Sequence, residues 1–364
     1  MAKIVSDEKL SLFVAKIFQA YGLHQKEAEI CTSVLVESDL RGIPSHGVAR
    51  LKRYTDGMDS GLIRADARPE IVQEGPSTAT VDGNGGLGQI IGHFATELAI
   101  LKAQDTGVGV VSVRNSNHYG IAGYYAQMML KKELLGISMT NSAPLVVPTF
   151  GKEMVIGTNP ISLAAPTHKQ EPFFLDMATS VVPRGKLEVY EREGKDLPEG
   201  WAVDESGKTT QDAGKVLQNM LGRTGGGILP LGGEGELFSG YKGYGMAVMV
   251  DILSGVLSGG AYANRVYAKK EGKTIPPNVC HFFLALDIER FVDLEVFKQN
   301  MDDLILLLKN SEKAKGQNHI FIHGEKEYEN YRNHKRNGIP LQEKVYQILE
   351  SLGEQHNILF DISK

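Results

Sequence analysis

The sequence predicts an α/β fold in which a core of alternating strands and helices is flanked by mainly helical segments at both ends of the chain. Three observations lead to this prediction. Residues 7–58 carry apolar side chains at helical spacing, the middle of the chain alternates β-branched runs with helical patterns, and helical patterns return at 293–309 and 341–353. Interleaved strands and helices are typical of an α/β core.

Three helices are predicted near the start of the chain. Residues 7–21 place apolar side chains on one face, at Leu10, Phe13, Val14, Ile17, Phe18 and Tyr21. Residues 25–40 repeat the pattern with Ala28, Cys31, Val34, Leu35 and Leu40. The third helix is predicted from about Ser45 to about Met58, because Pro44 favours a helix entrance and Ser45 is a natural N-cap.

The middle of the chain supplies the predicted strands. Strand signals occur at 79–83, 108–113, 134–141, 154–165, 171–178 and 280–288, and the run at 108–113 is of the buried type. Helices are expected at 88–107, 120–133 and 244–258. Residues 183–227 are rich in Gly, Lys and Glu and are predicted to form an exposed excursion, and 319–325 is predicted to form a strand and turn.

Composition excludes several classes of function. The 364 residues carry a net charge of -5 without a long basic run, which argues against a nucleic-acid partner. No apolar run approaches the roughly 18 residues of a membrane span. Cys31 and Cys280 lack metal spacing, so they are expected to be buried thiols of a reducing compartment, by default the cytoplasm. No HExxH, GxSxG or GxxxxGK[ST] motif occurs, and no metal site is expected.

A glycine segment resembles a dinucleotide-binding fingerprint. Residues 83–88 fit G-x-G-x-x-G after a strand, but a Rossmann unit also needs an acidic residue about 20 positions on, at the end of its second strand. Asp105 comes before the strand at 108–113 and so lies on the wrong side to reach a ribose. We therefore prefer a glycine turn that opens a helix.

The first candidate site lies between Arg41 and Tyr54. On the predicted third helix His46, Arg50 and Tyr54 share one face at spacing i, i+4, i+8. An arginine fork can hold a carboxylate bidentately, and a helix N-terminus favours the anion, so an organic acid could bind here. The alternative is a surface helix with a serine cap and ordinary polar residues.

Other candidates follow strands. His118, in Asn115-Ser116-Asn117-His118-Tyr119-Gly120, could serve as a general acid or base, although a lone loop histidine is often structural. Asp176 ends a buried run and could accept hydrogen bonds from ribose hydroxyls, or be a turn aspartate. Lys242 precedes the predicted helix at 244–258 and could bind a phosphate, or belong to a flexible loop. The weakest candidate is the turn His323-Gly324-Glu325.

Taken in order, these segments resemble the malate/L-lactate dehydrogenase family of the second, non-Rossmann type. The resemblance spans roughly residues 10–350 and rests on RGIPSHGVARL, VDGNGGLGQ, RNSNHYGIAGYY, GISMTNSAPLVVPTFG, IGTNPISLAAP, FFLDMATSVVPRGK, EGWAVDESG and YKGYGMAVMVDILSGVLSGG. It implies a non-Rossmann NAD(P)-binding sheet domain with a flanking, mainly helical N- and C-terminal part, usually in a homodimer. We expect residues 76–294 to form the α/β cofactor-binding core, and 1–75 with 295–364 the helical part for substrate binding and dimerisation.

The resemblance also implies hydride transfer between NAD(P) and the C2 atom of a small 2-hydroxy or 2-oxo acid. His118 matches the family's acid/base histidine, and Ser45 with His46 matches a pair given a relay and proton-donor role in some members. Arg50 and Tyr54 match substrate contacts. Cofactor contacts are matched by Ser142, Asp176, Met177, Ala178, Lys242, Gly324 and Glu325.

Two departures from the family pattern narrow the range of possible substrates. Members that resemble ureidoglycolate dehydrogenases carry an aspartate where this chain has Ala143, and a substrate arginine where it has Thr274-Ile275-Pro276-Pro277. Ureidoglycolate is therefore disfavoured. A turn that often reads Pro-Gly-Glu is His323-Gly324-Glu325 here.

The favoured function is malate dehydrogenase, with NAD as the expected cofactor and NADP as the alternative. Three alternatives on the same scaffold are a lactate, a sulfolactate or a sugar-derived 2-oxo acid reductase. A fourth is a reductase of cyclic ketimines. An inactive nucleotide-binding protein is an alternative of another class, against which the presence of Ser45, His46, Arg50 and His118 argues. The sequence decides neither between NAD and NADP nor which of His46 and His118 carries the proton.

Overall fold

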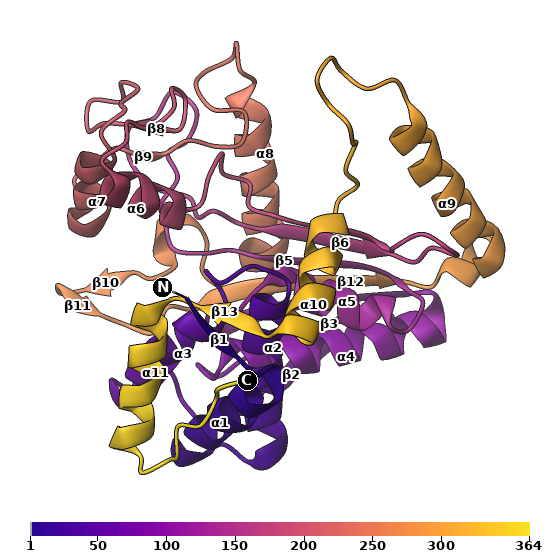
Figure 1. The fold of residues 1–364 in the computed structure, drawn as a ribbon, viewed down its shortest axis with the longest axis horizontal. Coiled ribbons are helices and arrows are strands. Elements are labelled where there is room, and N and C mark those ends of the chain that lie inside the picture. The colour runs from indigo at the N-terminus through magenta and orange to yellow at the C-terminus, as the bar shows by residue number, and fades with distance from the viewer. Residues whose placement is uncertain (1) are drawn as a thin grey trace.

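A mixed seven-stranded sheet forms the centre of the computed structural model, which describes residues 2–364 (Figure 1). Its strands run in the order β2 (Glu70–Glu74), β3 (Thr78–Asp82), β4 (Val108–Ser116), β12 (Val279–Leu286), β5 (Leu135–Thr140), β6 (Ile161–Ala165) and β7 (Phe173–Met177). Strands β3 and β4 pair in parallel and are joined by α4 (Gly88–Thr106), whereas every other neighbouring pair is antiparallel.

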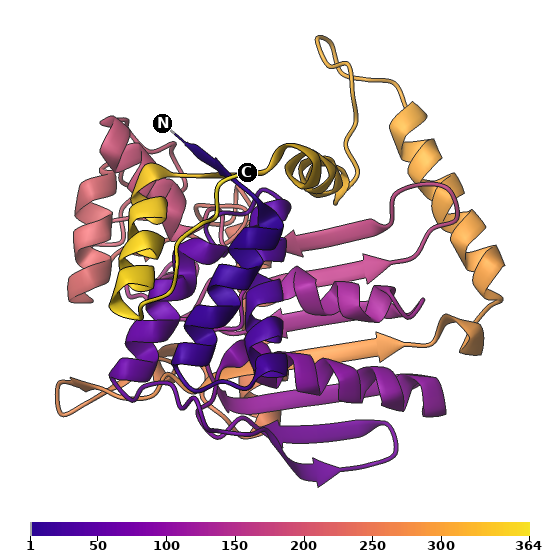
Figure 2. The ribbon, with the colours of Figure 1, turned by 60° about the horizontal axis from the view of Figure 1, so that its bottom comes forward.

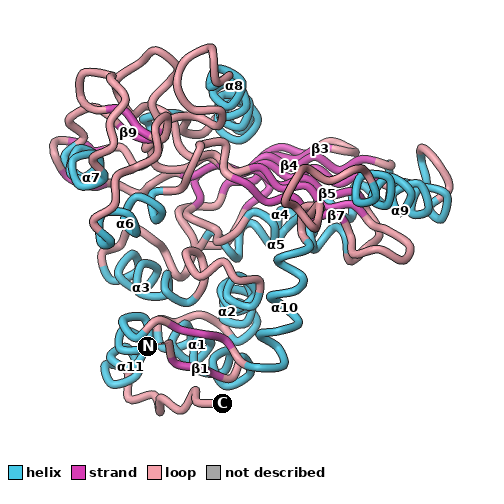
Figure 3. The backbone as a smooth tube through the Cα atoms, turned by 45° about the horizontal axis from the view of Figure 1, so that its top comes forward, coloured by secondary structure: helices cyan, strands magenta, loops and turns pink. Residues whose placement is uncertain are grey.

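Helices cover one face of the sheet along its length, and on the other face helices pack only at one end (Figure 3). Along β12 the side chains of Phe283 and Ala285 pack into the cluster under α4 and α5 (Ala122–Leu130). The alternate side chains, Phe282 and Leu284, pack with α8 (Gly240–Asp251) and the π-helical turn η2 (Ile252–Val256). Successive strand residues point to opposite faces, so a strand packed on both faces carries apolar side chains at successive positions, as β12 does at Phe282, Phe283, Leu284 and Ala285.

One edge of the sheet collects the loops that carry candidate residues. Strands β3, β4, β5 and β7 end at this edge, where β6 and β12 begin, because Ser116 pairs with Val279, Thr140 with His281, and Ile161 with Met177. The loops after β4, β5 and β7 therefore emerge side by side. We call this border the carboxyl edge of the sheet.

The two ends of the chain fold together into one helical part (Figure 2). It contains α1 (Asp7–Ala20), α2 (Gln25–Leu40), α3 (Leu51–Asp59), α10 (Glu325–Asn337) and α11 (Glu343–Gln355). Strand β1 (Lys3–Val5) pairs with β13 (Ile339–Leu341), and Val5 bridges to Ser363. Leu10, Phe18, Leu349 and Ile362 are fully buried in its shared core.

Residues 183–227 are not the exposed excursion that their composition predicts. They form α6 (Arg184–Glu193), β8 (Ala202–Val203), α7 (Ala213–Gly222) and β9 (Gly227–Ile228), which enclose a core of their own with Val146 and Val182. Leu187 and Val216 are fully buried there. The prediction failed because a few well-spaced apolar residues are enough for two short helices, whatever the intervening charge.

Other expectations for the chain are confirmed or corrected in detail. The helices at 7–21, 25–40, 88–107, 120–133, 293–309 and 341–353 are confirmed, the fifth as α9 (Leu294–Asn310). No strand forms at 319–325, where the backbone is irregular up to a turn that opens α10, a helix the sequence analysis did not predict.

A small hairpin, β10 (Lys269–Lys270) with β11 (Lys273–Thr274), follows the 3-10 turn η3 (Ala263–Arg265). No helix within residues 2–364 has the length and apolar character needed to span a membrane.

Candidate active site

The third helix does not begin at Ser45, so the predicted N-cap is wrong. Residues 48–50 form a 3-10 turn, η1 (Val48–Arg50), and α3 follows from Leu51. The cap is supplied by another helix, because the Asp39 carboxylate accepts a hydrogen bond from the Val48 N–H at 2.7 Å. A Cβ on Gly47 would lie 2.0 Å from Asp39 Oδ1, so this approach requires glycine. His46 therefore lies in the turn before the helix and not on its face.

The turn nevertheless brings Ser45, His46 and Arg50 together. The Ser45 hydroxyl oxygen lies 2.9 Å from His46 Nδ1, and Arg50 Nε donates a hydrogen bond to the Ser45 carbonyl oxygen at 2.6 Å. Among residues 2–364, no carboxylate lies within ion-pair distance of the Arg50 guanidinium. Arg50 is thus oriented by the backbone and retains the charge to bind an anion.

His118 reaches the same place from the loop after β4. Its Nδ1 lies 2.6 Å from the Tyr54 hydroxyl oxygen and 3.3 Å from the Gly120 nitrogen. The His46 and His118 rings are stacked, with centroids 5.5 Å apart and planes at 20°. Side chains from the turn at 45–50, from α3 and from the carboxyl edge of the sheet therefore share one site.

The hydrogen bonds of His118 fix its protonation pattern. A backbone N–H can only donate, so Nδ1 is the acceptor and the neutral ring carries its proton on Nε2. Burial, followed by the charge of Arg53, holds the pKa of His118 well below its ordinary value. Burial, followed by Arg50 and Arg53, lowers the pKa of His46 to about 4. Both imidazoles are therefore neutral at neutral pH.

The glycine segment at 83–88 supports the His118 loop from below. The Asn117 side-chain amide donates to the carbonyl oxygens of Gly85 and Gly86 at 3.0 and 2.9 Å, and a Cβ on Gly88 would lie 2.2 Å from the Asn117 carbonyl oxygen. The segment forms the turn that opens α4, as the preferred interpretation of its sequence predicts.

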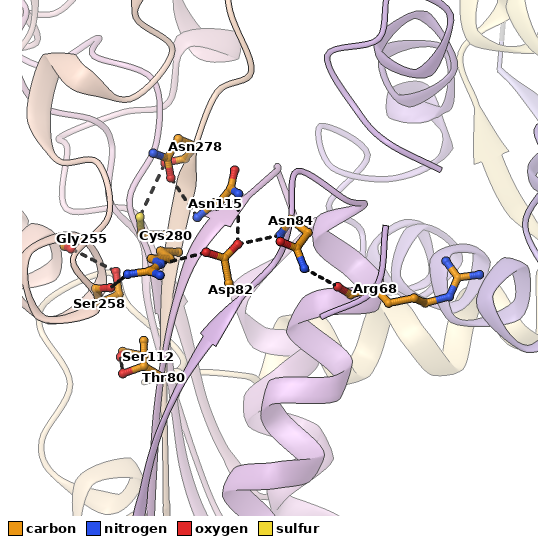
Figure 4. A network of polar contacts seen from close by, with 11 residues as sticks. Arg68, Thr80, Asp82, Asn84, Ser112, Asn115, Gly255, Ser258, Asn278 and Cys280 are labelled. Carbon is orange, nitrogen blue, oxygen red and sulfur yellow. Dashed lines mark hydrogen bonds and ion pairs between the residues drawn. The ribbon is translucent and has the colours of Figure 1, made fainter. Parts of the chain in front are cut away.

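Asp82, which precedes this turn, connects it to the end of β4 (Figure 4). Its carboxylate accepts hydrogen bonds from Arg114 Nε at 2.9 Å, the Asn115 side chain at 3.0 Å and the Asn84 N–H at 2.9 Å. An ion pair and two amide donors on one carboxylate make the base of the His118 loop rigid.

A buried histidine that the sequence analysis placed only in a strand lies beneath the same loop. His281 Nε2 is 2.8 Å from the Ser116 hydroxyl and its Nδ1 is 2.8 Å from the Thr140 hydroxyl. Its ring is parallel to that of Tyr119, with centroids 4.3 Å apart. His281 thereby fixes the residues on both sides of His118.

The candidate cofactor residues lie along the carboxyl edge and beyond it. Ser142 follows β5, and its hydroxyl accepts a hydrogen bond from the Thr158 N–H at 3.0 Å. Asn141 and Asn159, on either side of this turn, both donate to the buried carboxylate of Asp251 in α8, each at 3.2 Å. The turn that carries Ser142 is therefore anchored to the helix that covers the sheet.

Asp176 has a structural partner of its own. Its Oδ2 accepts a hydrogen bond at 2.8 Å from the N–H of Gly123, in the first turn of α5. Burial raises the pKa of this carboxyl to about 7. Met177 and Ala178 follow it and are partly exposed at the edge.

Lys242, Gly324 and Glu325 lie in two other helix starts. Lys242 is exposed in the first turn of α8, not before it as predicted. Gly324, at φ 100°, opens α10 against β7, where a Cβ would lie 2.7 Å from that of Phe174. The Glu325 carboxylate is already bound by Lys309, by His319 at 3.1 Å and by the Ile322 N–H at 3.1 Å.

A cleft of about 630 Å³ contains none of the predicted site residues. It lies between the segment around Met154 and the loops that carry Arg223 and Arg265. Next to it, Tyr267 contacts Arg53, a residue of α3 that the sequence analysis did not select. Its position three residues after Arg50 was a signal available in the sequence, whereas nothing in the sequence indicated Tyr267.

Comparison with known proteins identifies relatives over the whole chain. The sequence profile of the malate/L-lactate dehydrogenase family matches residues 5–350. Malate dehydrogenase from Pyrococcus horikoshii is 49% identical over 351 residues, 96% of this chain and 95% of that protein. A malate/(S)-sulfolactate dehydrogenase from Methanothermus fervidus is 36% identical over 358 residues, 98% of each. The crystal structure of malate dehydrogenase from Entamoeba histolytica superposes with a TM-score of 0.94 at 34% identity over 100% of both chains.

Proposed function

From the premise that this chain belongs to the malate/L-lactate dehydrogenase family and is a 2-hydroxy acid dehydrogenase, we propose that its substrate pair is malate and oxaloacetate. The observation that carries the proposal is Arg50, an arginine without an acidic partner in residues 2–364, beside two neutral imidazoles. This arrangement suits a carboxylate next to a carbonyl or hydroxyl group that exchanges a proton.

Arg50 binds the C1 carboxylate in this proposal. Its Nε is held by Ser45, which leaves its two Nη groups for the substrate. His118 then faces the C2 oxygen with Nε2. When bound, nicotinamide supplies the hydride chemistry, and the protein supplies position and proton.

The proton is handled by His118 together with Tyr54. A hydroxyl can donate or accept, so Tyr54 can bind Nδ1 of the neutral ring and can also bind the N–H of an imidazolium. The negative charge of a bound acid offsets Arg50 and Arg53, whose charges lower the pKa of His118 in the free protein. Substrate binding therefore raises that pKa toward the working pH, at which His118 protonates the C2 oxygen during reduction.

The residues proposed for the cofactor have the chemistry that NAD(P) needs. Asp176 is a hydrogen-bond acceptor for ribose hydroxyls, and Lys242 is an exposed cation at a helix start suited to a phosphate. Gly324 lets the start of α10 pack closely on Phe174, where a Cβ would not fit. Ser142, Met177, Ala178 and Glu325 complete the proposed set. This would be a non-Rossmann site, a proposal supported by a sheet with one parallel pair and by a glycine segment that packs on Asn117.

We further propose NAD as cofactor, a homodimer, and a cytoplasmic protein. The compartment is supported by two free, buried cysteines. The division into residues 76–294 and 1–75 with 295–364 is retained as the proposed cofactor and substrate parts. Light scattering tests the dimer, and limited proteolysis tests the division.

One assay tests the proposed function. Purified protein is mixed with NADH or NADPH, and absorbance at 340 nm is followed with oxaloacetate, pyruvate, sulfopyruvate, a sugar-derived 2-oxo acid and a cyclic ketimine. We expect the highest kcat/KM with oxaloacetate and NADH. A higher value with sulfopyruvate would favour a sulfolactate dehydrogenase. Absence of turnover with all five substrates would favour an inactive nucleotide-binding protein.

A further inference from the structure

We infer that Arg53 binds the second acid group of the substrate and so makes the enzyme selective for 2-oxo diacids over 2-oxo monoacids. The inference rests on the proposed function, since it concerns the far end of the same substrate. Arg50 and Arg53 would then form a pair, one guanidinium for each end of a four-carbon diacid.

The two arginines are presented by one helical segment. Arg53 lies three residues after Arg50, whose backbone is already helical, so their side chains leave the same side of α3. The next residue, Tyr54, bonds to His118. Side chains three apart on a helix begin about 5–6 Å from each other, a span that a four-carbon diacid can bridge while its C2 oxygen faces His118.

Arg53 is held in place without being neutralised. Its Nη2 donates a hydrogen bond to the Tyr267 hydroxyl at 2.5 Å, and its guanidinium carbon lies 5.6 Å from the centroid of that ring. The Tyr267 carbonyl oxygen in turn accepts from Arg223 at 2.9 Å. A phenol orients a guanidinium but leaves its charge intact, which is what an anion site requires.

The acidic side chains of residues 2–364 form no ion pair with Arg50 or Arg53. Within residues 2–364, Arg53 forms no ion pair, as is true of Arg50, whereas neighbouring Lys52 pairs with Asp56 at 2.7 Å and Arg184 with Glu188 at 2.9 Å. Burial is the main cause of the lowered pKa values of Arg50, His46 and His118. The positive charge of Arg53 lowers all three further. Two adjacent, unpaired cations repel each other, so a dianion gains more here than a monoanion.

The test compares substrates within one variant. We expect Arg53→Gln to lower kcat/KM for oxaloacetate by about 30- to 1,000-fold, mainly through KM, and to lower kcat/KM for pyruvate far less. Arg53→Lys should recover little, because lysine lacks the planar fork. Lys52→Gln is the matched control, a cation of the same helix with its own acidic partner, and should leave the oxaloacetate-to-pyruvate ratio unchanged.

Tyr267→Phe separates substrate binding from packing. It keeps the ring and removes the hydroxyl that orients Arg53, so it should lower kcat/KM for oxaloacetate by a smaller factor and add nothing in an Arg53→Gln background. As a readout without turnover, malonate should raise the Tm of the wild type in the presence of cofactor but not that of Arg53→Gln. Acetate, a monoanion, should give no such difference.

The inference is overturned if Arg53→Gln lowers kcat/KM for oxaloacetate and pyruvate equally, or if the wild type prefers pyruvate. In either case turnover of a 2-oxo acid would still support the proposed dehydrogenase activity. Absence of wild-type turnover with every 2-oxo acid would instead contradict the proposed function, whatever malonate does.

Discussion

The Tyr54 hydroxyl lies 2.6 Å from Nδ1 of His118, closer than the other group bonded to that atom, the Gly120 N–H at 3.3 Å. This hydroxyl is the group that can follow a change in the protonation of the ring. Burial raises the pKa of Tyr54, so the phenol stays protonated throughout.

We expect Tyr54→Phe to lower kcat by about 10- to 100-fold, the value of a hydrogen bond to a charged group, with little change in cofactor KM. Steady-state kinetics in the reductive direction measure this. Tyr21→Phe removes a phenolic hydroxyl bonded to Asp59 in the same helical part and should leave kcat unaltered. Equal losses in the two variants would contradict a role for Tyr54 in proton transfer.

The second prediction separates the two histidines. General acid–base groups contribute about 10²–10⁴ in rate, and we expect His118→Ala to lose that factor in kcat with folding intact. His46→Ala should lose less in the reductive direction, because His46 lies beside Arg50 and bonds to Ser45. If His46→Ala abolishes turnover while His118→Ala retains most of it, the two roles are exchanged.

The pH profile gives the third prediction. Oxidation of the hydroxy acid needs a neutral base, and burial keeps the pKa of both imidazoles below the ordinary 6.5, that of His46 at about 4. Because protonation removes the base, kcat/KM should stay level from pH 8 to 6.5 and fall only below that. His118→Ala should flatten this acid limb. A wild-type midpoint at or above 6.5 would show that burial does not control the base.

Much of this site was predictable because it follows local patterns. His118 ends a buried β-branched run, and strands that leave a sheet at one edge bring their following loops together, which gathers Ser142 and Asp176 at the same edge. Arg50 and Tyr54 are four apart on a helical segment, and that spacing alone places them on one side.

The failures share one physical cause, which is contact with residues distant in sequence. Ser45 looks like an N-cap, yet Asp39 on α2 caps the turn and Gly47 makes room for it. His281 is one apolar-looking position in a strand until Ser116 and Thr140 are brought to its two nitrogens by neighbouring strands. The partners of Glu325 and the ring that holds Arg53 are likewise set by tertiary packing.

The last prediction concerns Asp39, through which that tertiary cap acts on stability. Burial raises the pKa of this carboxyl to about 7, whereas in the unfolded chain it is near 4. Between these values the unfolded state loses its proton first, so the stability that protonated Asp39 contributes is present below pH 4 and is lost as pH rises to about 7.

Asparagine keeps an oxygen to accept from Val48 but cannot ionise, so Asp39→Asn should gain stability relative to the wild type as pH rises from 4 to 7. The gain should approach a few kcal/mol, at about 1.4 kcal/mol per pH unit, and then level off. Urea unfolding at several pH values measures this gain.

The raised pKa of Asp176 is common to both proteins and cancels in the difference. Asp56→Asn, at an exposed site, should give a difference independent of pH. A pH-independent difference for Asp39→Asn as well would mean that the buried carboxyl is already ionised at pH 4, with its charge stabilised by the Val48 N–H and the start of the helix.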